Sequence, residues 1–223
     1  MIPGADFDDL PQAVKLAEKY DEVFFAVGIH PYDIDKFDES TMEKYVNHPK
    51  CIAIGECGLD YFRLPEDEFE KQENIKKQKE VFIAQINFAK KVKKPLIVHI
   101  REASNDSRQI LIDCNAKEVG GVLHCFNASE HLLPLAEHNF CFGIGGVLTF
   151  KNAKKLVEIL PQIPKDKLLI ETDAPYLTPH PHRGERNEPY YTIFVASKIA
   201  ELLGLSIEEI ENMEQDHKLA RLA

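Results

Sequence analysis

Residues 51–56 read Cys-Ile-Ala-Ile-Gly-Glu, an apolar, β-prone run that ends in the carboxylate of Glu56. Residues 95–99 read Pro-Leu-Ile-Val-His, a second such run that ends in the imidazole of His99. Between the two runs, residues 68–92 carry apolar side chains at helical spacing. The order strand, helix, strand predicts a βα unit of a parallel sheet, with both polar side chains at strand ends.

The same placement recurs further along the chain. The apolar run 120–123 leads into His124, and the run 168–172 leads into Asp173. In a (β/α) barrel the carboxyl ends of the strands open onto one mouth, so ligands far apart in the sequence converge there. The repetition predicts a mononuclear or dinuclear metal site rather than separate core residues. Its expected metal ligands are Glu56, His99, His124 and Asp173.

Short β-prone runs and longer segments of helical period alternate along the chain. Strands are expected at residues 23–29, 51–55, 96–99, 122–124, 140–144 and 168–170, with the tail of another at residues 2–4. Helices are expected at residues 8–20, 68–92, 103–114, 129–138, 152–160 and 189–203, and capping boxes at Ser40-x-x-Glu43 and Ser206-x-x-Glu209 open two more. This pattern predicts an α/β fold in a single domain over residues 1–223.

The strand count is lower than that of a complete barrel. A closed TIM-type (β/α)8 barrel has eight strands and typically about 250 residues. The chain has 223 residues. The deficit falls at the N-terminus, because the remaining units follow one another without a gap. We therefore expect a (β/α)8 TIM-type barrel that lacks its first strand, its first helix and most of its second strand. A smaller open sheet is the alternative.

Composition excludes several classes of protein. Hydrophobic residues make up 44% and charged residues 29%, as in ordinary globular proteins, and the longest apolar runs are too short to cross a membrane. The net charge of −10 argues against a broad basic face for duplex DNA, although it allows a small anion-binding pocket with metal ions. Five cysteines without a C-x-x-C pair predict neither a disulfide framework nor a zinc knuckle, and they favour a cytoplasmic location.

The expected ligands limit the metal and its chemistry. Two imidazoles and a carboxylate suit Zn, Mn, Fe or Ni, whereas Ca would require oxygen ligands. Asp173 can both hold a metal and accept a proton from its bound water. Two nearby carboxylates have open roles: Asp60 either belongs to the site or stabilises a turn, and Glu171 either shares the face of Asp173 or forms a buried salt bridge. Cys57 and Cys125 each follow an expected ligand directly, so strand alternation predicts that they pack in the core.

The loop at residues 180–189 contains candidate substrate-binding residues. It places Arg183, Arg186 and Asn187 around a flexible glycine, and an arginine fork matches the oxygens of a phosphate group. The alternative is a solvated loop that is held by salt bridges to its own glutamates.

Two further candidates lie at strand ends. Arg101 follows the expected ligand His99 and is another candidate for phosphate binding. His30 ends the strand expected at residues 23–29, and we expect it to contact the substrate rather than the metal.

Seven motifs follow one another along the chain. They are Gly28-Ile-His-Pro, Ile54-Gly-Glu-Cys-Gly-Leu-Asp-Tyr, Val98-His-Ile-Arg-Glu, Leu123-His-Cys-Phe, Thr149-Phe-Lys-Asn-Ala, Glu171-Thr-Asp-Ala-Pro-Tyr-Leu and Arg183-Gly-Glu-Arg-Asn-Glu-Pro. Together they closely resemble the TatD family of metal-dependent deoxyribonucleases, a branch of the amidohydrolase-like barrels. The resemblance covers residues 2–205.

The resemblance implies a (β/α) barrel enzyme with two divalent metal ions, Mg, Mn or Zn, which hydrolyses DNA phosphodiester bonds with metal-activated water. It implies that Glu56 bridges the two ions. His99 and His124 would bind one ion, while Asp173 would bind the other and help to activate water. Glu56 and Asp173 are therefore the expected catalytic residues. The implied substrate-binding residues are His30, Arg101, Arg183, Arg186 and Asn187. The implied partner is DNA as substrate, single-stranded or at DNA ends, with no membrane and no obligate protein partner.

The chain departs from the family pattern in two places. Family members begin with a strand that carries an Asp-x-His-x-His motif and completes the metal site, and the sequence does not contain this motif. Residues 213–223 lack the Asn and Leu-Phe ending usual for the last helix. Three hypotheses therefore stand: a deoxyribonuclease, a hydrolase of amides or lactones with the same metal constellation, and a non-catalytic remnant that binds one metal or none.

Overall fold

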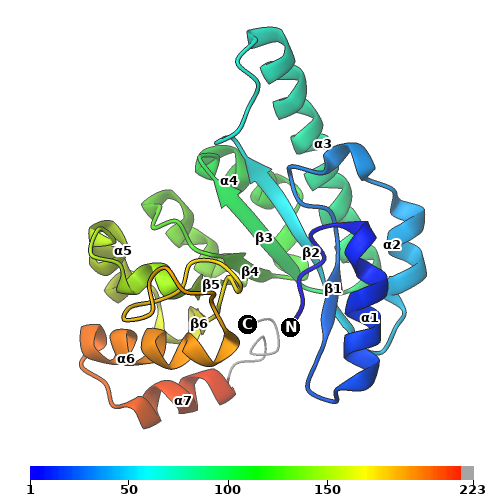
Figure 1. Cartoon of the computed structure of the whole chain (residues 1–223). Coiled ribbons are helices and arrows are strands. Elements are labelled where there is room, and N and C mark those ends of the chain that lie inside the picture. The colour runs from blue at the N-terminus through cyan, green and yellow to red at the C-terminus, as the bar shows by residue number, and fades with distance from the viewer. Residues whose placement is uncertain (217–223) are drawn as a thin grey trace. The chain divides into compact units, whose positions relative to one another are not determined.

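Two units make up residues 1–216, the part of the chain that the computed structural model describes (Figure 1). The first comprises residues 1–122 and the second residues 123–216. The described residues form an α/β fold with six strands, and the strand pairs within each unit are parallel. This confirms the predicted fold class. Barrel closure, the missing N-terminal elements and the single domain stay predictions.

The first unit alternates strands and helices. Its strands are β1 (Phe25–Val27), β2 (Cys51–Asp60) and β3 (Leu96–Arg101), followed by β4 (Gly121–His124), which continues into the second unit. Its helices are α1 (Leu10–Lys19), α2 (Glu39–Val46), α3 (Glu68–Val92) and α4 (Ser104–Asp113), with 3-10 turns at Phe7–Asp9, Ile34–Lys36 and Ala116–Glu118. β2 pairs with β1 and with β3, and its register places Gly58 opposite His99.

The strand end expected at residues 2–4 is present as an isolated bridge. Ile2 pairs in parallel with Phe25, and the N–H of Ala26 donates to the carbonyl of Ile2 (2.9 Å). The N–H of Gly4 donates to the carbonyl of Gly55 in β2 (2.9 Å). The backbone of residues 2–4 therefore hydrogen-bonds to both β1 and β2. A side chain does not fit at Gly4, because an added Cβ would lie 2.5 Å from the carbonyl oxygen of Ala26.

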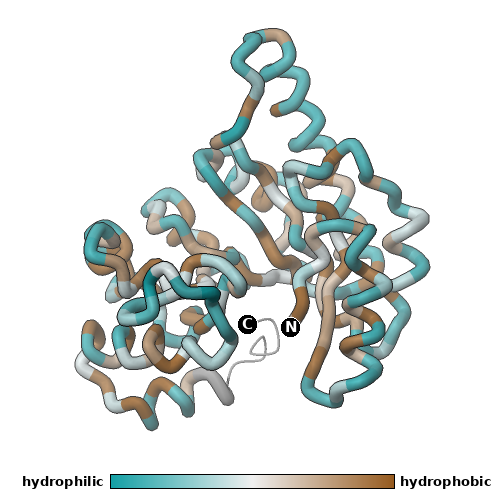
Figure 2. The backbone as a smooth tube through the Cα atoms, in the orientation of Figure 1, coloured by the Kyte–Doolittle hydropathy of each residue, from teal (hydrophilic) through white to brown (hydrophobic). Residues whose placement is uncertain are grey.

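The longest helix, α3, has the predicted bounds and packs against β2. Asp67 caps its first turn by accepting a backbone N–H (2.9 Å). Phe82, Ile86 and Ala89 are buried as predicted, whereas Ile75 is only half-buried. Burial of Phe82 alone contributes roughly 2–3 kcal/mol. Figure 2 shows the resulting pattern, in which β3 is mainly hydrophobic and the first turns of α3 are mainly hydrophilic.

Two helix starts differ in how they are capped. The capping box expected at Ser40 and Glu43 is wrong, because Asp38 caps α2 and accepts the N–H of Ser40 (3.1 Å). A carboxylate offers two acceptor oxygens, and the hydroxyl of Ser40 itself donates to one of them (2.7 Å). The box expected at Ser206 and Glu209 is confirmed. The N–H of Ser206 donates to Oε2 of Glu209 (2.7 Å), and the N–H of Glu209 donates to Oγ of Ser206 (3.2 Å).

The second unit contains the strands β5 (Phe140–Ile144) and β6 (Leu168–Ile170), which pair in parallel. Its helices are α5 (Lys154–Ile159), α6 (Thr192–Leu203) and α7 (Ile207–Asp216). Its 3-10 helices are Glu130–His138, Gly146–Thr149, Leu160–Gln162, Lys165–Lys167 and Pro189–Tyr191. The helix expected at residues 129–138 is thus a 3-10 helix, and it contains Pro134, which has no N–H for an α-helical hydrogen bond.

Strand lengths differ from the prediction in the first unit. β1 is shorter than residues 23–29, and β2 continues beyond residue 55 as far as Asp60. Glu56 and Asp60 therefore lie in the same strand. None of the described helices is long and apolar enough to cross a membrane. The C-terminal departure from the family pattern falls largely on residues 217–223, which lie outside the described residues.

Candidate metal centre

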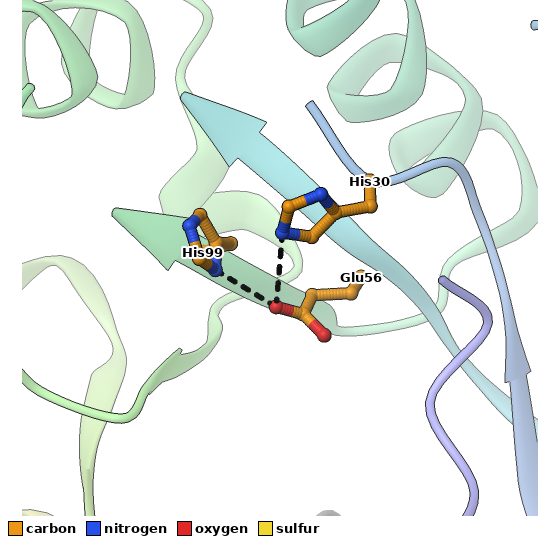
Figure 3. A group of neighbouring side chains, drawn as sticks. All are labelled: His30, Glu56 and His99. Carbon is orange, nitrogen blue, oxygen red and sulfur yellow. Dashed lines mark hydrogen bonds and ion pairs between the residues drawn. The ribbon is translucent and has the colours of Figure 1, made fainter. Parts of the chain in front are cut away.

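Three side chains of the first unit form a compact group of possible metal ligands. His30 follows β1, Glu56 lies in β2 and His99 lies in β3. One ligand atom of each lies within 4.8 Å of the others. Figure 3 shows both imidazole rings directed at one oxygen of Glu56, which is 2.9 Å from Nδ1 of His99 and 3.8 Å from Nε2 of His30. The group brings together two of the expected metal ligands, Glu56 and His99.

His30 was expected to contact the substrate, and the structure places it among these possible ligands. Its Nδ1 accepts the N–H of Tyr32 (3.1 Å), so that Nε2 is directed at Glu56. Burial lowers the pKa of His30, and the neighbouring His99 lowers it further. A neutral imidazole is the form that binds metals. A substrate contact of His30 stays a prediction.

Asp60 fixes the orientation of the His99 ring. Its Oδ2 is 2.8 Å from Nε2 of His99, and its Oδ1 accepts the N–H of Phe62 (2.9 Å). Burial raises the pKa of Asp60, but the hydrogen bonds from His99 and Phe62 outweigh it and hold the pKa below its usual range. A carboxylate on one ring nitrogen of a histidine is the usual support of a metal ligand, because it leaves the other nitrogen aimed at the ion. Asp60 therefore makes both contacts that the sequence left open, a hydrogen bond within the turn through Oδ1 and a bond to the expected ligand His99 through Oδ2.

The carboxylates around His99 favour positive charge at its ring. Burial lowers the pKa of His99, but hydrogen bonds to Asp60 and Glu56 raise it above its usual value. An ion bound between Nδ1 of His99 and Glu56 would replace that proton. The donor set of two imidazoles and one carboxylate suits a divalent transition metal. The residues of the first unit therefore fit a metal ion.

Two buried glutamines of α3 hold the backbone at this group. Gln85 accepts the N–H of Ile29 (2.8 Å) and donates to its carbonyl (3.0 Å), next to His30. Gln78 forms the same two bonds with Asp60 (2.8 and 2.9 Å). Both glutamines are at most 2% exposed, and their spacing puts them on one face of α3. Neither glutamine was predicted as part of the site, although polar residues within an apolar helical stripe are a signal for buried hydrogen bonds.

Glycines allow β2 to approach β3 beside Glu56. Gly55 and Gly58 have positive φ angles of 145° and 140°. A Cβ on Gly58 would lie 2.0 Å from the carbonyl oxygen of His99, and a Cβ on Gly55 would lie 2.5 Å from that of Ile97. The strand that carries Glu56 can therefore pair closely with β3 only if glycine occupies both positions.

The second unit contains a smaller group around His124. Nδ1 of His124 is 2.9 Å from Oε2 of Glu171, and its Nε2 is 3.4 Å from Oδ1 of Asp173. The other oxygen of Glu171 accepts the N–H of Cys125. Glu171 is buried and Asp173 is half-buried. Glu171 thus forms a buried pair with His124, which is one of the two roles that the sequence left open. Through this contact Glu171 orients the ring of His124, as Asp60 orients the ring of His99.

Comparison with known proteins identifies relatives of the chain. The family model described as TatD related DNase matches residues 1–217. The metal-dependent hydrolase YabD of Bacillus subtilis is 43% identical in an alignment of 223 positions that covers 97% of the chain and 84% of YabD. The 3'-5' ssDNA/RNA exonuclease TatD of Escherichia coli K12 is 35% identical in an alignment of 217 positions that covers 92% of the chain and 79% of that enzyme. The crystal structure of YJJV, a TatD homologue from Escherichia coli K12, superposes with a TM-score of 0.84 at 25% identity and covers 95% of the chain and 81% of YJJV.

The chain belongs to the TatD family of metal-dependent hydrolases. This confirms the resemblance that the seven motifs carried. The family is described as metal-dependent, and the His30, Glu56 and His99 group is a possible metal site in the first unit. Deoxyribonuclease activity, the number and identity of the ions and the missing Asp-x-His-x-His segment stay predictions.

The arginines predicted to bind substrate lie against aromatic rings or glutamates. Arg101 is exposed at the end of β3, with its guanidinium 3.5 Å from the ring centroid of Phe62. The guanidinium of Arg183 likewise lies 3.8 Å from the ring centroid of Phe150. Arg186 is exposed, and its Nε lies 3.6 Å from Glu188. That last contact is the salt bridge expected if the loop is simply solvated.

Asn187 holds the loop at residues 180–189 in place. It is 2% exposed, and its Nδ2 donates to the carbonyl of Tyr176 (2.6 Å). Its Oδ1 accepts the N–H of Glu188 (2.9 Å). Both ends of the Asn187 amide are thus engaged with backbone groups, and a role of Asn187 in substrate binding stays a prediction.

Of the two cysteines next to the expected ligands, Cys57 packs in the core as predicted, whereas Cys125 is only half-buried and does not. Cys57 is fully buried, and burial raises the pKa of its thiol far above the usual range. A neutral buried thiol packs like a small apolar side chain. Cys125 is half-buried and contributes its backbone N–H to Glu171.

Proposed function

We propose that the chain is a metal-dependent nuclease that hydrolyses phosphodiester bonds of single-stranded DNA or of DNA ends. The observation that carries this proposal is the His30, Glu56 and His99 group, in which three possible ligand atoms lie within 4.8 Å of one another. Support for a nucleic acid as substrate comes from the 35% identical relative named as a 3'-5' ssDNA/RNA exonuclease.

Two divalent ions, Mg, Mn or Zn, are the proposed cofactors. Glu56, His99 and His30 would hold an ion in the first unit, and His124 and Asp173 provide further ligands in the second. A bound divalent ion supplies Lewis-acid polarisation of the phosphate and lowers the pKa of a water molecule. Asp60 and Glu171 keep the two histidine rings in the orientation that presents one nitrogen each.

Asp173 is the proposed proton acceptor. Its side chain is 37% exposed, so it can exchange protons with solvent and reach an attacking water molecule. Glu56, with a side chain that is 10% exposed, is less suited to this role and better suited to hold an ion in a low-dielectric site. We therefore assign ion binding to Glu56 and proton acceptance to Asp173.

Arginines would orient the phosphate. Arg101 is exposed and is fixed by its stack on Phe62, and Arg183 is fixed by its stack on Phe150 and by a hydrogen bond to the carbonyl of Thr178 (3.2 Å). A fixed guanidinium loses little conformational freedom when it binds phosphate oxygens. Arg186 is more exposed and would add charge rather than a fixed contact.

Digestion of a short end-labelled single-stranded oligonucleotide with Mn²⁺ or Mg²⁺ tests the proposal. We expect the wild-type chain to cleave it, and Glu56→Gln to reduce the rate at least about 100-fold because a charged ligand is lost. Glu73→Gln is the matched control, since Glu73 is an exposed carboxylate on α3. Full activity of Glu56→Gln, or a metal-loaded wild-type chain that cleaves no nucleic acid, would contradict the proposal.

A further inference from the structure

Two exposed aromatic rings lie beside the His30, Glu56 and His99 group. Tyr32 is 41% exposed and Phe62 is 49% exposed. The ring of Tyr32 packs edge-on against the ring of His30, with centroids 4.8 Å apart. Phe62 follows the end of β2, which carries Glu56. Large apolar side chains at a site of hydrolysis are available to a ligand, because they are not needed in the core.

Phe62 and Tyr32 both lie close to the carboxylate of Asp60. The backbone N–H of Phe62 donates to Oδ1 of Asp60 (2.9 Å). Burial and the nearby carboxylate of Asp60 raise the pKa of the Tyr32 hydroxyl. The other oxygen of Asp60 is 2.8 Å from Nε2 of His99. One buried carboxylate therefore links both aromatic residues to a candidate metal ligand.

The guanidinium of an arginine lies close to each of the two rings. The guanidinium of Arg101 lies 3.5 Å from the ring centroid of Phe62, which is a stacked arrangement. The guanidinium of Arg63 lies 5.4 Å from the ring centroid of Tyr32. Arg63 and Arg101 are both exposed. The patch formed by Tyr32, Phe62, Arg63 and Arg101, which we call the aromatic patch, thus combines flat apolar faces with positive charge.

We propose that the aromatic patch is a subsite for an unpaired nucleobase, with Phe62 as the stacking surface and Arg101 as the contact to the adjoining phosphate. Aromatic rings and guanidinium planes are the groups on which proteins stack the bases of single-stranded nucleic acids. The inference rests on the proposed nuclease function, because Phe62 lies just after β2, the strand that carries the candidate metal ligand Glu56.

Charge selects a nucleotide over an apolar peptide as the occupant. A nucleotide has an aromatic base for Phe62 and an anionic phosphate for Arg63 and Arg101. An apolar side chain of a peptide would leave both cations without a partner from the ligand. A duplex end is also disfavoured as the occupant, because its bases are already stacked and paired.

Binding of a phosphorothioate oligothymidylate, which resists hydrolysis, tests the subsite in the metal-loaded protein. Its affinity is compared, by fluorescence polarisation, with that of the same backbone carrying abasic residues. We expect the wild-type chain to prefer the base-containing oligonucleotide on the order of tenfold. Phe62→Leu should remove most of this preference, and Phe62→Trp should retain it because it restores a stacking face.

Phe69→Leu is the matched control for loss of an exposed ring. Phe69 is 76% exposed in the first turn of α3 and forms no part of the aromatic patch. We expect it to leave the preference for bases unchanged. Equal preference in wild type and Phe62→Leu would overturn the proposal, as would tighter binding of an aromatic peptide than of the oligonucleotide.

Cleavage assays separate failure of the subsite from failure of the proposed function. If the metal-loaded chain binds bases preferentially through Phe62 but cleaves no phosphodiester, the subsite stands and the proposed nuclease function fails. If the chain cleaves base-containing and abasic oligonucleotides equally, and Phe62→Leu changes neither rate, the subsite is overturned while the nuclease function stands.

Discussion

Each unit holds one histidine between two carboxylates, and the two arrangements differ in which ring nitrogen faces which acid. In the first unit Asp60 bonds to Nε2 of His99, so Nδ1 meets Glu56. In the second unit Glu171 bonds to Nδ1 of His124, so Nε2 faces Asp173. Buried carboxylates thus set both rings, and each ring presents a single nitrogen to a possible ion.

The outer carboxylates differ in exposure as well. The side chain of Glu56 is 10% exposed and that of Asp173 is 37% exposed. The first unit also adds His30, and the group of His30, Glu56 and His99 is the set of three possible metal ligands found within the described residues. Under the proposed function, we therefore expect the first unit to hold an ion and Asp173 to exchange protons.

The largest expected effect separates these two tasks. Asp173→Asn should lower the rate of DNA hydrolysis by roughly 100-fold or more, because the proton acceptor is lost, and leave metal binding by His30, Glu56 and His99 intact. Glu56→Gln should lower both hydrolysis and metal content. Steady-state rates with metal analysis of both variants check this. Equal loss of metal in the two variants would show that the tasks are not divided.

The supporting carboxylates should have intermediate effects. Asp60→Asn and Glu171→Gln keep the size of each side chain but weaken the bond to its histidine, and we expect each to lower metal affinity or activity about 10- to 100-fold. Competition with a chelator of known affinity measures this. Wild-type affinity in both variants would mean that ring orientation does not depend on these acids.

Loss of a backbone-holding glutamine should cost stability. Gln85→Leu leaves the N–H and carbonyl of Ile29 buried without that partner, which costs about 1–3 kcal/mol of the free energy of unfolding. Gln72→Leu is the matched control on the same helix. Gln72 is exposed, and its side chain donates a hydrogen bond to Glu68. Urea unfolding of both variants provides the comparison. Equal stability of the two would remove the role assigned to Gln85.

The smallest effect is expected at the loop. Arg186→Ala removes an exposed contact to Glu188 and should change the free energy of unfolding by less than about 1 kcal/mol. If Arg186 binds phosphate as predicted, its loss should nevertheless weaken oligonucleotide binding at low salt. Thermal unfolding and a binding titration of this one variant distinguish the two roles. Unchanged binding would leave the residue with the solvated-loop role.

The positions of the strands were the most predictable part of the molecule, although β2 ends at Asp60 and not before Glu56. The runs before Glu56, His99 and His124 are strands, because short apolar stretches bounded by glycine or proline leave few other choices. The ends of α3 were predictable for a similar reason, since its apolar period continues over many turns. The cap of α2 was not, because Asp38 and Ser40 both offer acceptor oxygens and only the backbone geometry decides between them.

The supporting residues were the least predictable. Asp60 reaches His99 because the register of β2 against β3 places Gly58 opposite His99, and no local pattern fixes that register. His30 was expected to bind substrate, and its place beside Glu56 depends on backbone bonds to Gln85 from a distant helix. Long-range pairing decides such contacts, whereas composition and period describe only each segment by itself.

The most direct test of the His30, Glu56 and His99 centre is a crystal of the chain grown with Zn²⁺ and measured at the zinc absorption edge. We expect an anomalous peak at about 2.0–2.2 Å from Nε2 of His30, Nδ1 of His99 and Oε1 of Glu56. A zinc-bound crystal without a peak at these atoms would contradict the account.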